Sequence, residues 1–251
     1  MIVLPGGGYS VCSDREADIV ALSYLNAGFH AFILRYTLKT VEAWPAPLAD
    51  YEKAMELLYS HREDWHIDME RIAVCGFSAG GHLAACAATV SKYKPAAAIL
   101  GYAALKKDIV EICQKGATVP LENVNRDTCP CFLFATRTDS IVDISNTLEF
   151  EQKLTENGVA FESHIYSCGA HGFSTGCEYM NGAELTTRAA HWVTESVGWL
   201  EELWGKLQAN GYSEPLFERR MNENDAERLS VRCTYNYVHQ FEDAKKDIVR
   251  P

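Results

Sequence analysis

The stretch Arg71 to Ala88, RIAVCGFSAGGHLAACAA, determines the fold that we expect of this chain. An apolar run leads into Gly76-Phe77-Ser78-Ala79-Gly80, and a helical pattern rich in alanine and glycine follows. A Gly-x-Ser-x-Gly sequence between a strand and a helix is typical of a sharp turn that exposes the serine hydroxyl at the end of the strand. The five-residue pattern alone also fits an ordinary Gly/Ser turn. Its context favours a nucleophilic serine at position 78.

Apolar runs typical of strands alternate with helical patterns on both sides of this stretch. The expected strands are Ile2–Leu4, Phe29–Tyr36, Ile72–Cys75, Ala96–Leu100, Cys131–Thr136 and Phe161–Tyr166, and a closing helix is expected over 187–204. This alternation predicts an α/β fold with a mostly parallel central sheet and helices on both faces. The length of 251 residues suits a single domain spanning 1–251.

Composition limits the classes of partner. The formal charge of −11 comes with no cluster of Lys and Arg, which argues against nucleic acid or an anionic membrane surface and makes a neutral or cationic ligand easier to accommodate. No window approaches 18 apolar residues, and Met1 to Leu4 is too short for the core of a signal peptide. We therefore expect a cytoplasmic protein without a membrane partner.

The nine cysteines are odd in number and lie mostly inside apolar runs, as Cys75 and Cys86 do. Buried free thiols in a reducing compartment explain this better than a disulfide framework. The sequence Cys129-Pro130-Cys131 lacks the spacing of a zinc site and reads as part of a strand. No metal and no cofactor are expected.

A nucleophilic serine needs a base, and the base needs a carboxylate that orients it. In this architecture the order along the chain is serine, acid, histidine. Asp139 follows a strand and is the expected acid, whereas Asp143 stands just before a helix and is better explained as its N-terminal cap. His171, in a glycine-flanked loop after the last strand, is the expected base, and His82 is expected to pack within its helix.

The segment LPGGGYS, Leu4 to Ser10, supplies glycines near the start of the chain. Acyl transfer passes through an oxyanion that backbone N–H donors stabilise, and in this architecture one donor follows the nucleophile while another comes from a glycine loop. We expect the N–H groups of Gly7, Gly8 and Ala79 to form this oxyanion hole and Tyr9 to line the pocket wall. A phosphate-binding loop is disfavoured because Gly-x-Gly-x-x-Gly and Gly-Lys-Ser/Thr are both missing.

With these residues in place, the chain resembles the α/β-hydrolase superfamily, and within it bacterial esterases related to acetyl xylan esterases and feruloyl esterases. The matching segments appear in the family's order between Ile2 and about Ser174: LPGGGYS, ILRYTLK, WPAPLADYEKAMELL, GFSAGGHLAA, ATRTDSIV and GAHGFS. The resemblance implies Ser78, Asp139 and His171 as a catalytic triad. It also implies hydrolysis of short acyl esters, typically acetyl groups on sugars such as those of xylan.

Two departures from the family pattern concern the substrate. Asp143 stands where the family usually has proline, and the segment from Tyr102 to Thr128 is short for a cap, which predicts a small cap and an open site. A small-molecule or oligosaccharide ester is the expected partner. The sequence leaves open whether the chain forms a homo-oligomer. The alternatives to a serine carboxylesterase are a serine peptidase of the same fold and a non-catalytic binding protein.

The position of the glycine loop raises the question of chain order. In this superfamily the loop follows the third strand, so the Phe29–Tyr36 strand would be left as an apolar edge. The stretch SVRCTYNYV, 230–238, alternates with a period of two, as a half-buried strand does. We therefore expect a circularly permuted order in which residues from about 222 to 251 supply the missing front strands. The alternative is a truncated start followed by an unrelated C-terminal arm.

Overall fold

The computed structural model describes residues 1–205, apart from 42–43, 179–180 and 182–185. Its centre is a sheet in which every pair of neighbouring strands is parallel, in the order β2-β1-β3-β4-β5-β6. The strands are β1 (Ile2–Leu4), β2 (Phe32–Ile33), β3 (Ala73–Phe77), β4 (Ala97–Gly101), β5 (Cys131–Thr136) and β6 (Phe161–Tyr166). The α/β fold with a parallel sheet is therefore confirmed.

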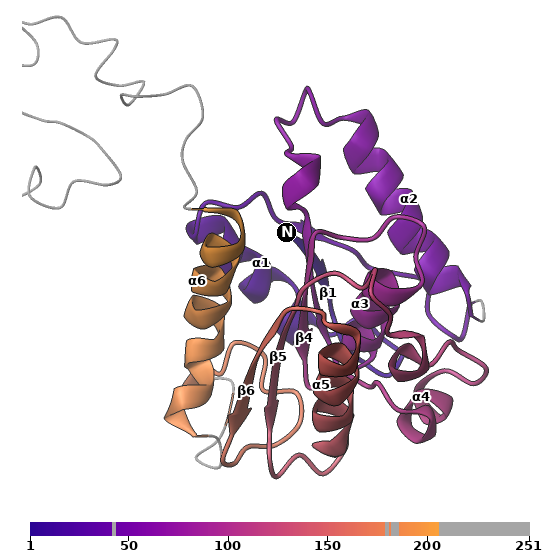
Figure 1. Ribbon diagram of the computed structural model, residues 1–251, viewed down its shortest axis with the longest axis vertical. Helices are drawn as coiled ribbons and strands as arrows, with labels where there is room; N and C mark the ends of the chain where they lie inside the picture. The colour runs from indigo at the N-terminus through magenta and orange to yellow at the C-terminus, as the bar shows by residue number, and fades with distance from the viewer. Residues whose placement is uncertain (42–43, 179–180, 182–185, 206–251) are drawn as a thin grey trace, which may run out of the picture. The chain divides into compact units, whose positions relative to one another are not determined.

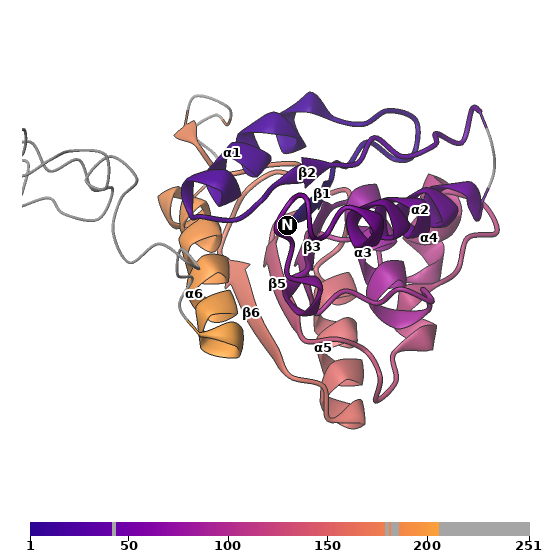
Figure 2. The same cartoon turned by 90° about the horizontal axis from the view of Figure 1, so that it is seen from above.

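Helices cover both faces of this sheet, as the alternating pattern predicts. They are α1 (Asp18–Asn26), α2 (Ala46–Ser60), α3 (Ala79–Thr89), α4 (Lys107–Cys113), α5 (Ser145–Asn157) and α6 (Trp192–Trp204). Short 3-10 turns are η1 (Asp14–Glu16), η2 (Met69–Arg71), η3 (Pro120–Asn123) and η5 (Thr187–His191). Figure 2 shows α1 and α6 on one face of the sheet and α2, α3 and α5 on the other. Every residue of the central strands β3, β4 and β5 is buried, which fits strands covered from both sides.

The strand expected over Phe29–Tyr36 is much shorter in the structure. Only Phe32 and Ile33 pair with β1, because β1 itself offers just three residues to the ladder. The Leu34 N–H still donates to Val3 O at 3.0 Å, and farther along Tyr36 donates its hydroxyl to the carbonyl of Pro5 at 2.5 Å. The apolar run therefore serves partly as core and only partly as strand.

Contacts along the chain separate Met1–Gly205 from Lys206–Pro251, and the fold above is that of the first unit. The expected strand at 230–238, the proposed permuted order and the extent of a single domain over 1–251 lie outside the described residues. Within the described part of the chain, no helix is both long and apolar enough to cross a membrane.

The parallel sheet brings the ends of β1, β3, β5 and β6 to one edge, where the loops that carry the candidate site residues follow. Figure 1 shows β5 and β6 side by side and running in the same direction. In the β1–β3 ladder Leu4 lies opposite Gly76, so the glycine loop after β1 begins beside the turn after β3. This arrangement depends on the start of α3 passing very close to the end of β1. A Cβ atom built on Gly80 would lie 2.1 Å from the Leu4 carbonyl oxygen, so only glycine fits there.

We predict that Gly80→Ala destabilises the fold by about 2 kcal/mol or more, because the added methyl group overpacks a site closed by backbone atoms. Gly198→Ala is the matched control, since Gly198 also lies in a helix, α6, and a Cβ there would meet nothing within 4 Å. Alanine is the better helix former, so this variant should gain up to about 1 kcal/mol. Urea unfolding measures both, and equal effects at the two positions would contradict the steric account.

Candidate active site

Ser78 lies on a strained turn between β3 and α3. Its φ of 52° and ψ of −116° fall in a region that side-chain-bearing residues rarely adopt. Two backbone hydrogen bonds hold this conformation: the Ser78 N–H donates to Gly101 O at 3.0 Å, and the Ser78 carbonyl accepts from His82 N at 2.9 Å. The turn presents the hydroxyl at the carboxyl edge of the sheet.

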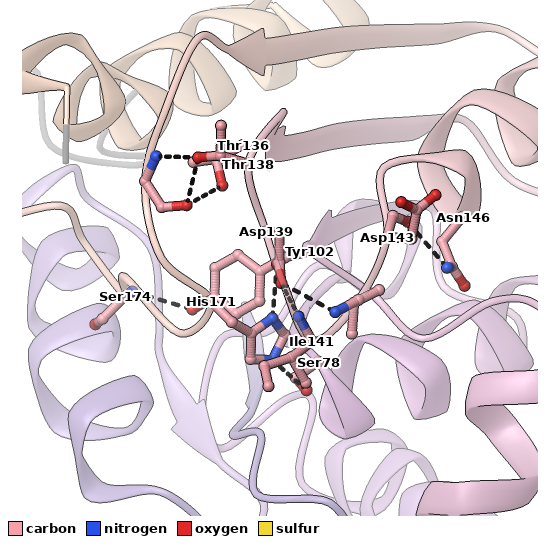
Figure 3. A network of polar contacts seen from close by, with 12 residues as sticks. Ser78, Tyr102, Thr136, Thr138, Asp139, Ile141, Asp143, Asn146, His171 and Ser174 are labelled. Atoms are coloured by element: carbon pink, nitrogen blue, oxygen red, sulfur yellow. Dashed lines mark hydrogen bonds and ion pairs between the residues drawn. The ribbon is translucent and has the colours of Figure 1, made fainter. Parts of the chain in front are cut away.

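The three side chains predicted as a triad form one chain of hydrogen bonds, shown in Figure 3. His171 Nδ1 lies 2.7 Å from Asp139 Oδ2, and His171 Nε2 lies 2.9 Å from Ser78 Oγ. A carboxylate can only accept, so Nδ1 carries the proton and Nε2 is free to accept the serine hydroxyl. The imidazole therefore has the tautomer that a general base needs.

Hydrogen bonds to both carboxylate oxygens hold Asp139 in place. Its Oδ1 accepts the backbone N–H groups of Ile141 and Val142 at 2.8 and 2.9 Å, which leaves Oδ2 to His171. Its side chain is almost completely buried. Asp143, the competitor, instead accepts the Ser145 N–H at the start of α5 at 2.9 Å, and hydrogen bonding to Ser145 lowers the pKa of its carboxyl group. The structure thus brings Asp139, and not Asp143, to the histidine.

The loop that carries His171 is tied to the end of β5. Thr136 and Thr138 both donate their hydroxyls to Gly169 O, and the Gly169 N–H donates back to Thr138 Oγ1 at 3.0 Å. The Tyr102 ring packs edge-on against the His171 ring with centroids 5.0 Å apart. Hydrogen bonds and an aromatic contact therefore limit the movement of the imidazole (Figure 3).

The glycine loop folds over the nucleophile. Gly7 and Gly8 have φ values of 127° and 60°, a backbone region that glycine adopts without strain. The Gly7 carbonyl accepts the N–H groups of Ser10 and Val11, which closes the loop into a tight turn. Gly7 and Gly8 line the same cavity as Ser78, whereas Ala79 is fully buried at the start of α3. The two glycines expected in an oxyanion hole therefore lie beside the serine.

The cavity above Ser78 has a volume of about 530 Å³. Its wall is largely apolar, and α4 contributes Ile109, Ile112 and Cys113 to it. The segment expected as a small cap thus forms one helix and one short turn, and its helix lines the cavity. Arg15 and Lys39 add positive charge to the wall.

Comparisons with known proteins agree with the α/β fold. A solved structure titled MGS-M1, an α/β-hydrolase enzyme from a Medee basin deep-sea metagenome library, is 38% identical with a TM-score of 0.73, covering 81% of this chain and 83% of that one. The chain belongs to the α/β-hydrolase superfamily. The BD-FAE family model matches residues 1–107 of this chain.

Two further relatives carry more specific names. The acetyl ester-xyloside bifunctional hydrolase from Caldicellulosiruptor lactoaceticus is 29% identical with a TM-score of 0.73, covering 81% of this chain and 82% of that one. The acetylxylan esterase of Xylanibacter ruminicola is 26% identical over 215 residues, which are 77% of this chain and 45% of that protein. The chain spans less than half the length of the curated relatives that it matches.

One sequence prediction within this α/β-hydrolase site is wrong. Tyr9 does not line the cavity: its side chain is fully buried, and its hydroxyl lies 2.6 Å from His82 Nδ1. The left-handed backbone of Tyr9, with φ of 58°, turns the side chain inward between Tyr36 and Trp44. Tyr9 therefore anchors the end of the glycine loop in the core, and this role depends on His82, which lies 73 residues away in the sequence.

Sequence reasoning also missed two polar residues beside the site, Glu16 and Tyr102. Glu16 lies in the charged segment SDREAD, a composition typical of a solvent-exposed surface. The residue is nevertheless only 4% exposed. Tyr102 follows β4, and its hydroxyl donates to Glu16 Oε1 at 2.6 Å. Neither residue carries a local pattern that predicts this contact.

The described residues hold no group of three or more His, Cys, Asp or Glu side chains arranged for a metal. Eight cysteines are described, and all are free thiols: Cys12, Cys75, Cys86, Cys113, Cys129, Cys131, Cys168 and Cys177. The ninth, at position 233, lies outside the described residues. Most of the described thiols are buried, as expected from the apolar runs that contain them.

His82 is buried in α3 between two hydrogen-bond partners. Its Nε2 lies 2.8 Å from Thr118 O, which can only accept, so Nδ1 accepts the Tyr9 hydroxyl. Burial lowers the pKa of His82 to about 4. His82 is therefore a packed, neutral histidine rather than a second base, in agreement with the sequence analysis.

This burial makes the stability depend on pH. The unfolded chain takes up a proton at His82 below about pH 6.5, whereas the folded chain resists protonation down to about pH 4. Stability is thus complete above pH 6.5 and is lost as the pH falls, by on the order of 3 kcal/mol. We predict that His82→Gln, which does not titrate, shows a smaller loss between pH 7 and 4 in urea unfolding. His30→Gln, at an exposed position, should behave like the parent, and identical pH profiles for all three proteins would contradict the assignment.

Proposed function

We propose that this chain is a serine carboxylesterase that hydrolyses short-chain acyl esters, acetyl esters in particular, on xylan-derived or other sugars. The observation that carries the proposal is the continuous hydrogen-bonded chain from Asp139 through His171 to Ser78, ending beside the glycine loop in an open cavity. The names of the acetylxylan esterase and the acetyl ester-xyloside hydrolase among the relatives support the sugar ester as substrate.

In the proposed mechanism, Ser78 Oγ attacks the ester carbonyl carbon while its proton passes to His171 Nε2. The carbonyl oxygen becomes an oxyanion, which the N–H groups of Gly7, Gly8 and Ala79 stabilise. Asp139 holds the imidazole in orientation and stabilises its positive charge. Collapse of the intermediate expels the alcohol, which takes the proton from His171 and leaves an acyl group on Ser78. Water, deprotonated by His171, then attacks the acyl-enzyme. The second oxyanion collapses, the bond to Ser78 Oγ breaks, and Oγ takes the proton back from His171, which releases the acid and restores free Ser78.

Two alternatives from the sequence analysis fit this site less well. A non-catalytic binding protein has no need of a histidine in the tautomer of a base or of a serine held in a strained conformation. A serine peptidase of the same fold would use the same three residues, and a peptide substrate distinguishes it. The relatives reported above are esterases or bear only the general name of hydrolase, which favours the ester.

We predict that Ser78→Ala lowers the rate of p-nitrophenyl acetate hydrolysis by at least roughly a thousandfold, because a triad acts as a unit and loses its function with any member. The fold should persist, as measured by circular dichroism. Ser10→Ala is the matched control, since Ser10 lines the same cavity but lies outside the hydrogen-bonded chain, and it should retain most of the activity. Retention of a tenth of the activity in Ser78→Ala would end the proposal.

We also predict a preference for acetyl and propionyl over octanoyl esters. Between β4 and β5 only α4 and η3 are formed, and the cavity of about 530 Å³ is open, so we expect its apolar wall to cover a short acyl chain and to leave the end of a long one in solvent. Values of kcat/KM across a series of p-nitrophenyl esters measure the preference, and acetylated xylo-oligosaccharides, feruloyl esters and a peptide substrate test the leaving group. Faster turnover of octanoyl esters would indicate a lipase-like pocket instead.

A further inference from the structure

Glu16 is a buried carboxylate close to the proposed nucleophile that the mechanism above does not use. It ends η1, eight residues after the glycine loop, and is only 4% exposed. It lines the same cavity as Ser78 and Gly7. A buried carboxylate is costly unless hydrogen bonds compensate it, so the contacts of its two oxygens indicate what it does.

One oxygen holds the glycine loop. Glu16 Oε2 accepts the backbone N–H of Gly6 at 2.8 Å, directly before the proposed oxyanion donors. Gly6 is itself enclosed between this carboxylate and the nucleophile turn: a Cβ atom built on it would lie 2.7 Å from Glu16 Oε2 and 3.1 Å from Ser78 Cβ. The hydrogen bond between Gly6 and Glu16 therefore fixes the position of the glycine loop relative to Ser78.

The other oxygen reaches the loop of the proposed base. Glu16 Oε1 accepts the Tyr102 hydroxyl at 2.6 Å, and the same hydroxyl accepts the Ser174 N–H at 3.0 Å. Ser174 lies three residues after His171, whose ring packs against Tyr102. The Ser174 hydroxyl in turn donates to the carbonyl of Arg15, next to Glu16. A closed ring of contacts thus joins the two loops, and Figure 3 shows its Tyr102–Ser174 side.

We propose that Glu16 is a positioning residue, whose two carboxylate oxygens hold the oxyanion loop and the His171 loop in fixed relation to each other across the nucleophile. The inference rests on the proposed esterase function. With both loops held, the Gly7 and Gly8 N–H groups stay directed at the reacting oxygen while His171 stays on Ser78. Because the donors stabilise charge that develops only in the transition state, their placement affects kcat more than KM.

A carboxylate suits this role better than a neutral group. It only accepts, so both oxygens can receive the Gly6 N–H and the Tyr102 O–H at once, and its charge strengthens both bonds. Burial raises the pKa of Glu16, and these two hydrogen bonds, together with the charge of His171, act in the opposite direction. An apolar side chain of the same size would pack at lower cost but would leave the Gly6 N–H unpaired.

The test is the variant Glu16→Gln. Glutamine keeps the size of the side chain but offers one acceptor oxygen, so one of the two donors loses its partner. We expect kcat for p-nitrophenyl acetate to fall roughly ten- to hundredfold, below the cost of losing an oxyanion donor outright, with KM changed less than about threefold. Affinity for a trifluoromethyl ketone should fall by a similar factor, because Ser78 Oγ adds to its carbonyl carbon, the C=O π bond opens to an oxyanion, and the serine proton passes to His171.

Glu195→Gln is the matched control. Glu195, on α6, also accepts a tyrosine hydroxyl, from Tyr166 at 2.9 Å, but it is not part of the cavity wall. Its replacement should leave kcat, KM and the inhibitor affinity within about twofold of the parent values. An equal fall in kcat for both variants would show a general effect of losing a Glu–Tyr bond and would overturn the inference.

A second variant keeps the proposal testable if Glu16→Gln fails to fold. Tyr102→Phe removes the link to the His171 loop and leaves the Gly6–Glu16 bond, so kcat should fall several-fold with little change in KM. Unchanged kcat in every folded variant at this ring would overturn the inference, as would a rise in KM alone. If the unmodified chain is inactive, the proposed function fails; if it is active and Ser78→Ala is not, only the role of Glu16 is in question.

Discussion

The close approach of α3 to the end of β1 is the constraint on which the rest of the site depends. Gly80 faces the Leu4 carbonyl oxygen at a distance that admits no side chain, and Gly76 in turn faces the Gly80 carbonyl oxygen so closely that a Cβ there would lie 2.2 Å from it. These contacts let a strand end, reverse and begin a helix within a few residues. The same contacts place the glycine loop, which continues from Leu4, directly beside Ser78.

Much of this site could be predicted from the sequence because its backbone geometry is specified locally. The elbow needs glycines on both sides of Ser78, and the parallel sheet brings the loops after successive strands to one edge, so the positions of Asp139 and His171 follow from strand order. The four strands β1, β4, β5 and β6 lie within a residue of their expected bounds for the same reason. The spacing of apolar residues and the glycines at the ends of helices and strands are properties of short segments, so a single sequence shows them.

What sequence reasoning missed depends on contacts between distant segments. Tyr9 follows the glycine loop, and nothing near it in the sequence indicates that His82 receives its hydroxyl in the core. Glu16 reads as a solvated charge for the same reason, because Tyr102 is 86 residues away. The strand expected from Phe29 onward shortens because its neighbour β1 has only three residues, a limit that its own composition does not reveal.

These buried polar groups explain how a glycine-rich loop can serve as a rigid element. Three successive glycines lose more backbone entropy on folding than any other tripeptide, so the loop does not hold its shape by itself. Glu16 receives the N–H of Gly6 before the proposed donors, and His82 receives the hydroxyl of Tyr9 after them. The first contact buries a carboxylate and the second buries an imidazole, and each costs stability that an apolar residue would not. The chain thus gives up stability to hold both ends of the loop where a transition-state oxyanion is proposed to form, the compromise expected of a site built for catalysis.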